Sequence, residues 1–149
     1  MYKEAKNAFN KTFYVIRYNP ELKIIDTRWE GYASKNDLKK ACQVGLELTR
    51  AVRCPFKLND NTNFSGPWSD SVAWLEKEWL PEAMRAGVRY LAHVAAPDSF
   101  GETAGEVMKM SLIGRQMDVC IFPNREKALD WLKSCQQEYA ESSSGNVST

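Results

Sequence analysis

The segment between Leu58 and Gly87 constrains the fold of this chain more than any other part of its sequence. A short apolar strand, predicted over 54–58, ends in Leu58-Asn59-Asp60 and leads into a polar loop over 61–67. An aromatic-rich helical pattern then runs from Trp68 to Gly87, with Pro81 expected to kink it or to start a new turn. Strand, polar loop and crossover helix in this order predict an α/β protein with parallel strands.

The rest of the chain extends this alternation. We expect strands over 12–18, 22–30, 88–95 and 116–122. Further helices are expected from a capping box at Ser34-Lys35-Asn36-Asp37, from Asp98 or Ser99 to about Ile113, and from Pro123-Asn124, the last with an apolar face of Ala128, Trp131 or Leu132, and Cys135. The order β-β-α-β-α-β-α-β-α predicts a β-hairpin that leads into a mixed, largely parallel sheet of four to five strands with about four helices. We expect one domain over 12–139, an N-terminal extension over 1–11 and a disordered Ser-rich tail over 140–149.

Composition and charge argue against several classes of function. The 149 residues carry 20 basic and 19 acidic side chains, a net charge of +1, so no overall field attracts nucleic acid. No apolar run is long enough to span a membrane, and the polar N-terminus does not resemble a secretory signal, so we expect a cytoplasmic protein. The four cysteines are scattered without metal-ligand spacing, which indicates buried thiols and predicts no metal site and no cofactor.

The pattern of chemically reactive residues does not indicate an enzyme. His93 is the only histidine and lies within a predicted strand, where we expect a core histidine with satisfied hydrogen bonds. No serine has the sequence of a nucleophile elbow, and no glycine-rich loop links a strand to a helix for phosphate binding.

One polar cluster stands out as a candidate binding site. It consists of residues after the third predicted strand and one residue after the fourth: Asp60, Asn61, Asn63, Ser65, Trp68, Ser71, Trp74 and Asp98. In open α/β sheets, ligands bind outside the carboxyl ends of the strands, where these residues are expected to lie. The alternative is that the Asn, Asp and Ser residues only form turns and helix caps.

Two tryptophans in the second helix suggest a contact surface. Trp74 and Trp79 are five residues apart and therefore point about 140° apart on a helix. We expect one of them to be buried with Leu75, and the other to be exposed or covered by the Pro81 turn or by a partner.

Short motifs in this order resemble the bacterial STAS-like proteins, which have the fold of sporulation anti-sigma-factor antagonists. The motifs are Trp29-Glu30-Gly31, Leu58-Asn59-Asp60, Trp74-Leu75, Trp79-Leu80-Pro81-Glu82-Ala83, Ala95-Ala96-Pro97-Asp98-Ser99-Phe100 and Ala128-Leu129-Asp130-Trp131-Leu132. The resemblance implies a sheet with helices packed largely on one side, related to the lipid-binding CRAL-TRIO fold.

In regulatory members of that family, a partner kinase phosphorylates a serine in an Asp-Ser-x-Gly motif after the third strand. By position, the resemblance implies Ser71 as the matching residue, although the chain continues with Val72-Ala73 and lacks the motif's glycine. A phosphate there would add nearly two negative charges to an interface.

These features lead to two functional expectations. The first is a non-enzymatic protein-interaction or regulatory module, which binds a protein partner or a second copy of itself through the second helix and the loop before it. The alternative is a small-molecule or lipid-binding module, in which a small apolar ligand occupies a crevice near Asp60 and Asp98.

Overall fold

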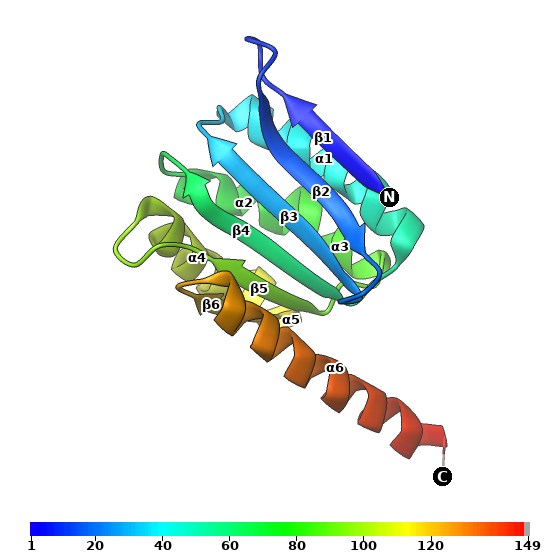
Figure 1. Ribbon diagram of the computed structural model, residues 1–149. Helices are drawn as coiled ribbons and strands as arrows, with labels where there is room; N and C mark the ends of the chain where they lie inside the picture. Colours follow the sequence, from blue (N-terminus) through cyan, green and yellow to red (C-terminus); the bar gives the residue numbers. More distant parts are fainter. Residues whose placement is uncertain (148–149) are drawn as a thin grey trace.

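A six-stranded mixed sheet forms the centre of the molecule, and its strands lie side by side in sequence order (Figure 1). The computed structural model describes residues 1–147. The strands are β1 (Tyr2–Lys6), β2 (Thr12–Asn19), β3 (Ile24–Gly31), β4 (Phe56–Phe64), β5 (Tyr90–Val94) and β6 (Asp118–Phe122). Strands β1 to β3 pair antiparallel, and β3 to β6 pair parallel. The α/β class and the leading hairpin are confirmed, but the sheet has six strands rather than four to five.

Strand β1 is the additional strand, and it lies where an N-terminal extension was expected. It pairs with β2, with Glu4 opposite Val15, and Ala5 is buried. Its other residues are mostly charged, which hides the strand pattern in the sequence. Lysines and glutamates of this kind are common on edge strands, because they discourage pairing with other chains.

Strand β4 is longer than the sequence indicates. The expected strand over 54–58 begins at Phe56 and continues to Phe64, through most of the segment expected to be a loop. The added length pairs with the end of β3, where Glu30 lies opposite Asn63 and Gly31 opposite Phe64. Tertiary pairing therefore overrides the low strand propensity of Asn and Asp.

Helices cover both faces of the sheet. They are α1 (Lys35–Val52), the 3₁₀ turn η1 (Ser69–Ser71), α2 (Val72–Trp74), the π-helical turn η2 (Leu75–Trp79), α3 (Leu80–Arg85), α4 (Phe100–Met110), α5 (Leu112–Gln116) and α6 (Arg125–Val147). Figure 1 shows α1 to α5 behind the sheet and α6 in front of it. Right-handed crossovers between strands in sequence order bring the connecting helices to the same face.

Local signals explain where two helices begin. Ser34 caps α1, and its hydroxyl accepts from the Asp37 N–H while the Asp37 carboxylate accepts from the Ser34 N–H, so the predicted capping box is confirmed. Ser99 caps α4 by accepting from the Glu102 N–H. Helix α4 does not extend to 113 as expected, because Ser111 interrupts it and caps the short helix α5.

The second predicted helix contains a π-helical turn that adapts it to Pro81. The Leu80 N–H donates to the Leu75 carbonyl, five residues earlier, and Pro81 lies in the first turn of α3. Proline cannot donate a hydrogen bond and its ring clashes with the carbonyl four residues before it, and a wider turn relieves that conflict.

Helix α6 extends beyond the expected end of the domain. It continues to Val147, so residues 140–147, expected to be a disordered tail, are helical, while 148–149 lie outside the described residues. Its predicted apolar face is confirmed, with Ala128, Leu132 and Cys135 buried. No helix in the described part of the chain has both the length and the apolar character needed to cross a bilayer.

Candidate functional site

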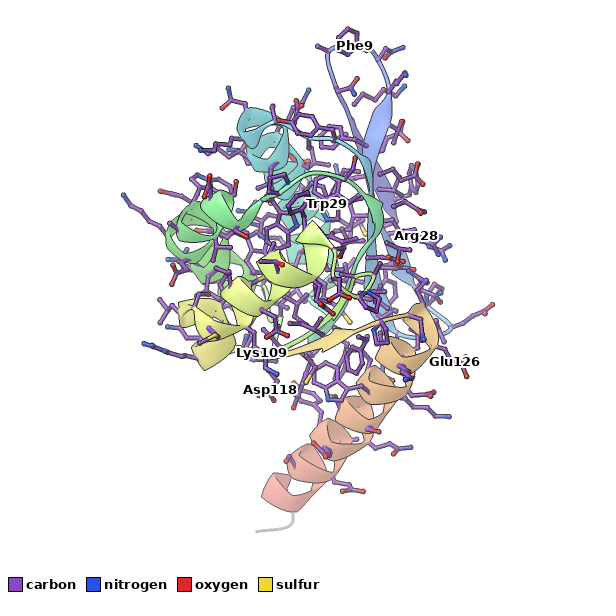
Figure 2. All side chains as sticks on the ribbon, turned by 90° about the vertical axis from the view of Figure 1, so that its left-hand side faces the viewer. Phe9, Arg28, Trp29, Lys109, Asp118 and Glu126 are labelled. Carbon is purple, nitrogen blue, oxygen red and sulfur yellow. The ribbon has the colours of Figure 1, made fainter. Side chains whose placement is uncertain are left out.

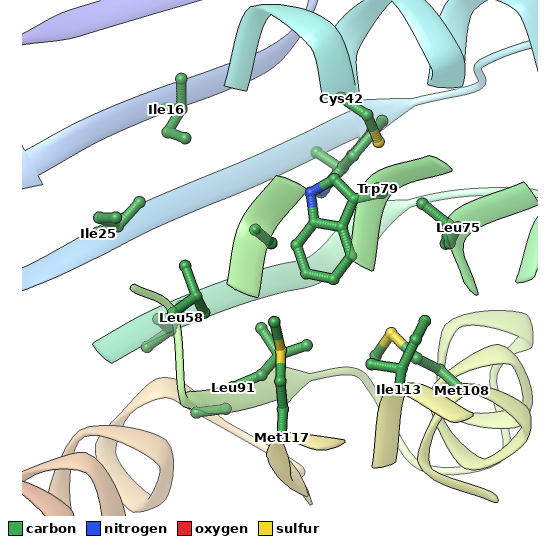
Figure 3. Close-up of a cluster of buried hydrophobic side chains, with 14 of the residues drawn as sticks. Ile16, Ile25, Cys42, Leu58, Leu75, Trp79, Leu91, Met108, Ile113 and Met117 are labelled. Atoms are coloured by element: carbon green, nitrogen blue, oxygen red, sulfur yellow. The ribbon is translucent and has the colours of Figure 1, made fainter. Parts of the chain in front are cut away.

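A cavity of about 50 Å³ lies between the sheet and the helices that cover its rear face. This volume holds about three to five water-sized groups. The sheet contributes Tyr14, Thr27, Trp29, Lys57, Asn59, Asn61, Phe64 and Leu91, and the helical layer contributes Leu38, Cys42, Trp68, Leu75, Trp79 and Met108. Figure 3 shows Trp79 among Cys42, Leu75, Leu91 and Met108, which form the apolar part of the wall.

Strand pairing explains why polar side chains gather at this cavity. Lys57, Asn59 and Asn61 alternate along β4 and therefore point to one face of the sheet. Asn59 on β4 is paired with Thr27 on β3 and with His93 on β5. The centre of the sheet therefore presents a polar row to helices that otherwise bury apolar side chains.

Three polar atoms at the cavity have no hydrogen-bond partner. They are Thr27 Oγ1, Asn61 Oδ1 and Trp68 Nε1, and all three are buried. The Thr27 hydroxyl lies near the Tyr14 phenol and acts to lower the pKa of that group, against the larger effect of burial. Folded proteins satisfy the large majority of buried polar atoms, so each exception indicates an ordered water, a ligand or a functional role.

Lys57 adds a buried positive charge to the same cavity. Its side chain is 6% exposed, and Nζ lies 5.1 Å from the centre of the Trp79 ring. Burial lowers the pKa of Lys57 from 10.5 to about 8, so the ammonium form still predominates at pH 7. Burial also raises the pKa of the Cys42 thiol to about 12 and raises the pKa of the Tyr14 phenol, so both groups are neutral.

A chain of hydrogen bonds begins at two residues that line the cavity, Trp29 and Asn59, and continues behind them to His93 and Gly101. The Trp29 indole N–H donates to Asn59 Oδ1 at 2.8 Å, and Asn59 Nδ2 lies 3.0 Å from His93 Nδ1. His93 Nε2 lies 2.9 Å from the Gly101 carbonyl. Because an indole N–H can only donate, Asn59 must turn its oxygen toward Trp29 and its NH₂ group toward His93.

This chain also fixes the protonation state of His93. Nδ1 accepts from Asn59 and Nε2–H donates to Gly101, which requires the neutral imidazole with its proton on Nε2. Burial lowers the pKa of His93, and the Gly101 hydrogen bond opposes that effect only in part. The expectation of a core histidine with satisfied hydrogen bonds is therefore confirmed.

Aromatic rings and a close helix approach hold this hydrogen-bond chain in place. Trp68 packs edge-on against His93, with ring centres 5.7 Å apart. Helix α4 passes so close that a Cβ at Gly105 would lie 2.5 Å from His93 Cδ2. In Figure 2, Trp29 lies in the interior between the sheet and the helices, consistent with its place at the start of the hydrogen-bond chain.

Asp60, one of the predicted site residues, lies on the opposite face of the sheet. Its carboxylate and that of Asp26 both accept from the Arg125 guanidinium of α6, at 3.0 Å and 2.6 Å. Burial tends to raise the pKa of Asp60, but hydrogen bonds from Thr62 and Arg125 outweigh it and lower the pKa overall. These contacts anchor α6 to the sheet and are remote from the cavity.

The structure brings only two of the predicted site residues together at the cavity, Asn61 and Trp68. Asn63 and Ser65 are exposed at the end of β4, and Asp98 is exposed in the turn after β5, with φ +62°. Ser71 is buried, so a kinase would reach its hydroxyl only after local opening of the turn.

The tryptophans of the second helix do not form an exposed surface. Trp79 is buried beside Leu75, as the sequence allowed for one of the pair. Trp74 is half-buried, and the Lys39 ammonium of α1 lies 5.7 Å from its ring centre. Lys39 of the same chain therefore covers part of Trp74, and a protein partner at this helix stays a prediction.

Sequence reasoning missed Lys57, Thr27, Asn59 and Cys42 as site residues. The segment over 54–58 has the mostly apolar pattern of a buried strand, and its single lysine does not by itself indicate a site. A charged residue in a buried strand, followed by Asn59 and Asn61 at a spacing of two, is the signal that indicates a polar row on one face.

The four cysteines are free, and no cluster of three or more His, Cys, Asp or Glu residues in the described part of the chain could hold a metal ion. Comparisons of this chain with protein-family models, with curated proteins and with solved structures find no match.

Proposed function

We propose that this protein is a small-molecule-binding module whose ligand occupies the cavity between β3–β5 and the rear helices. The observation that carries the proposal is that Thr27 Oγ1, Asn61 Oδ1 and Trp68 Nε1, all buried and without partners, border the same cavity as the unpaired Lys57 ammonium. A ligand with an apolar body and a few polar atoms would satisfy these groups. This is the second of the two functions expected from the sequence, with the site inside the fold rather than outside the strand ends.

Two features support the proposal. The hydrogen-bond chain from Trp29 to Gly101 holds one wall in a single arrangement, and such rigidity reduces the entropy lost on binding. The opposite wall contains Leu75 and Trp79 from the π-helical turn η2, a type of turn that occurs frequently at functional sites. Phe64, at the carboxyl end of β4, is partly exposed and marks the side of the cavity nearest to solvent.

The arrangement of the sheet agrees with a STAS-like fold, which stays part of this proposal. The crossover helices between β3 and β6 pack on one face of the sheet, which supports this part of the proposal. The proposed activity is binding, because burial raises the pKa of Cys42, the thiol at the cavity, to about 12 and keeps it un-ionised.

Native mass spectrometry of protein purified from its own host tests the proposal. We expect an additional mass that is lost on denaturation and is absent from the Leu91→Phe variant, in which the larger ring fills part of the cavity. Leu22→Phe, the same change at an exposed turn residue, serves as the control and should keep the additional mass. A wild-type protein without additional mass, whose melting temperature no small apolar or amphipathic compound raises, would contradict the proposal.

A second candidate, self-association, is favoured by the edge strand β6. Unlike β1, this strand carries one charged residue, Asp118, at its start and is otherwise apolar. Hydrogen bonds from Asp118 N–H to Arg89 and from Ala95 N–H to Phe122 set the ladder so that the N–H groups of Val119 and Ile121 point away from β5. The exposed side chains of Phe100, Val107 and Met110 form one stripe on the neighbouring helix α4.

The occupant that we propose for this edge is β6 of a second copy, paired antiparallel, because unpaired strand groups are satisfied best by another strand. Analytical ultracentrifugation of the wild type and of Ile121→Pro tests it. Proline at 121 removes an outward N–H without breaking the internal ladder. A wild-type dimer that becomes monomeric in the variant supports the proposal, and a wild-type monomer at high concentration contradicts it.

A further inference from the structure

We propose that the ligand of the cavity is a short-chain monocarboxylate, with its carboxylate paired to the Lys57 ammonium. This inference rests on the proposed function and specifies the chemical class of its ligand. The observation behind it is the charge of the cavity wall: among the described residues that line it, Lys57 carries a formal charge and no aspartate or glutamate is present.

The Lys57 ammonium has no counter-ion among the described residues. No side-chain hydrogen bond or ion pair within the described residues involves the Lys57 ammonium, and the residue is 6% exposed. Asp26 on the adjacent strand β3 and Asp60 on β4 itself face the other side of the sheet and are held by Arg125. A buried charge without a partner is strongly unfavourable, and an anionic ligand would remove that penalty.

Neighbouring groups favour an anion over a cation or a neutral molecule. The Trp79 ring, 5.1 Å from Nζ, stabilises the ammonium form without neutralising it. The Thr27 hydroxyl lies on the same face of the adjacent strand, two residue pairs further along than Lys57, and its oxygen is buried without a hydrogen-bond partner. It can donate to a carboxylate oxygen, as can the unpartnered indole N–H of Trp68.

The remaining wall determines the rest of the ligand. Leu38, Leu75, Leu91 and Met108 provide an aliphatic surface suited to a short hydrocarbon chain. The volume of about 50 Å³ limits the ligand to a few heavy atoms, the size of propanoate or butanoate. A second carboxylate would have no second cation to pair with, which favours a monocarboxylate.

Isothermal titration calorimetry with butanoate and its neutral analogue butanamide tests the inference. At pH 7 we expect the wild-type protein to bind butanoate at least tenfold more tightly than butanamide. Lys57→Met should weaken butanoate binding at least tenfold. Lys40→Met, which makes the same change in net charge at an exposed position of α1, should leave it unchanged.

The pH dependence of butanoate binding by the wild-type protein tests the role of Lys57 without a substitution, so a folding defect in the variant cannot affect it. Raising the pH from 7 to 9.5 should weaken butanoate binding at least tenfold, because Lys57 loses its proton in this range. The other titratable groups at the cavity, Cys42 and Tyr14, stay neutral because burial raises both of their pKa values.

Two outcomes would overturn the inference, and they can be told apart. If butanoate and butanamide bind equally to the wild type and to Lys57→Met, the cavity binds small molecules but does not select an anion. If neither compound binds, and the native protein carries no additional mass, the proposed function fails together with the inference.

Discussion

Asn59 on β4 and His93 on β5 lie side by side, with Asn59 Nδ2 3.0 Å from His93 Nδ1. Because Asn59 also accepts from the Trp29 indole, one amide satisfies polar groups on both neighbouring strands, β3 and β5. These hydrogen bonds remove much of the cost of burying polar side chains at the centre of the sheet.

Replacing Asn59 should therefore destabilise the whole domain. Asn59→Ala leaves the Trp29 N–H without an acceptor and His93 Nδ1 without a donor, and two unsatisfied buried groups should lower the free energy of unfolding by about 2–4 kcal/mol. Urea denaturation measures this loss. Asn63→Ala, at an exposed position of the same strand, should change stability by less than about 0.5 kcal/mol. Equal stability of the two variants would show that the hydrogen-bond chain does not stabilise the fold.

Lys57 should reduce the stability of the ligand-free protein. Its folded-state pKa of about 8 lies below its ordinary value of 10.5, so at pH 7 a charge is held in an unfavourable site. Removing the charge with Lys57→Met should stabilise the protein by up to about 3 kcal/mol at pH 7. Chemical denaturation of the ligand-free wild type and variant measures the difference.

The stability difference between Lys57→Met and the wild type should depend on pH, whereas a difference caused by packing alone would not. Between pH 8 and 10.5 the unfolded state binds more protons at Lys57 than the folded state, so the wild type gains stability as the pH rises through this window. The advantage of Lys57→Met should therefore shrink between pH 8 and 10.5. A constant difference across that range would contradict a buried, unpaired ammonium.

Arg125 should be essential for the docking of α6. Arg125→Met leaves the Asp26 carboxylate, 1% exposed, without its main partner, and we expect a loss of about 3 kcal/mol at pH 7. Arg28→Met is the control, because Arg28 lies 3.8 Å from the same carboxylate but is half exposed, and its loss should cost less than about 1 kcal/mol. Thermal and urea unfolding of the two variants compare these losses.

Acid should diminish the effect of Arg125→Met. The lowered pKa of Asp60 means that its stabilising contribution is present above its unfolded value of 3.8 and is lost as the pH falls through the folded value. The stability difference between wild type and variant should therefore be largest near neutral pH and decrease below about pH 4. A difference that grows in acid would exclude carboxylate pairing as its cause.

Gly105 should be required for the contact between α4 and His93. Alanine normally favours a helix over glycine, yet a Cβ at this position would lie 2.5 Å from His93 Cδ2 and 2.9 Å from Nε2. Gly105→Ala should therefore lower the melting temperature and disturb the Nε2–Gly101 hydrogen bond. An NMR spectrum with the His93 ring resonances unchanged, together with a higher melting temperature, would contradict this tight packing.

Much of the fold follows from the sequence, because hydrophobic periodicity and caps act locally. The hairpin, the Ser34 capping box and the buried face of α6 are examples. Strand β1 was missed because the residues around Ala5 are charged, and its identity depends on pairing with β2. The end of β4 was missed because Asn61 and Asn63 favour turns unless a neighbouring strand holds them.

Less of the candidate site than of the fold could be predicted from the sequence. Asn61 and Trp68 were identified because they follow a buried strand, but Asp60 faces the opposite side of the sheet as a consequence of the two-residue strand period. The residues that surround Lys57 and Asn59 come from β3, β5 and the helical layer, which are distant from them in the sequence. Strand register and helix packing, which no local pattern specifies, bring these groups to one cavity.

We propose that Lys57 is a buried ammonium that pairs with the carboxylate of a ligand. NMR titration of the Lys57 side chain, with and without butanoate, tests it most directly. We expect a midpoint near pH 8 in the ligand-free protein and a clear upward shift when butanoate is bound, because the carboxylate stabilises the charged form. A midpoint near 10.5 that butanoate does not move would contradict the claim, since Lys57 would then behave as an ordinary exposed lysine.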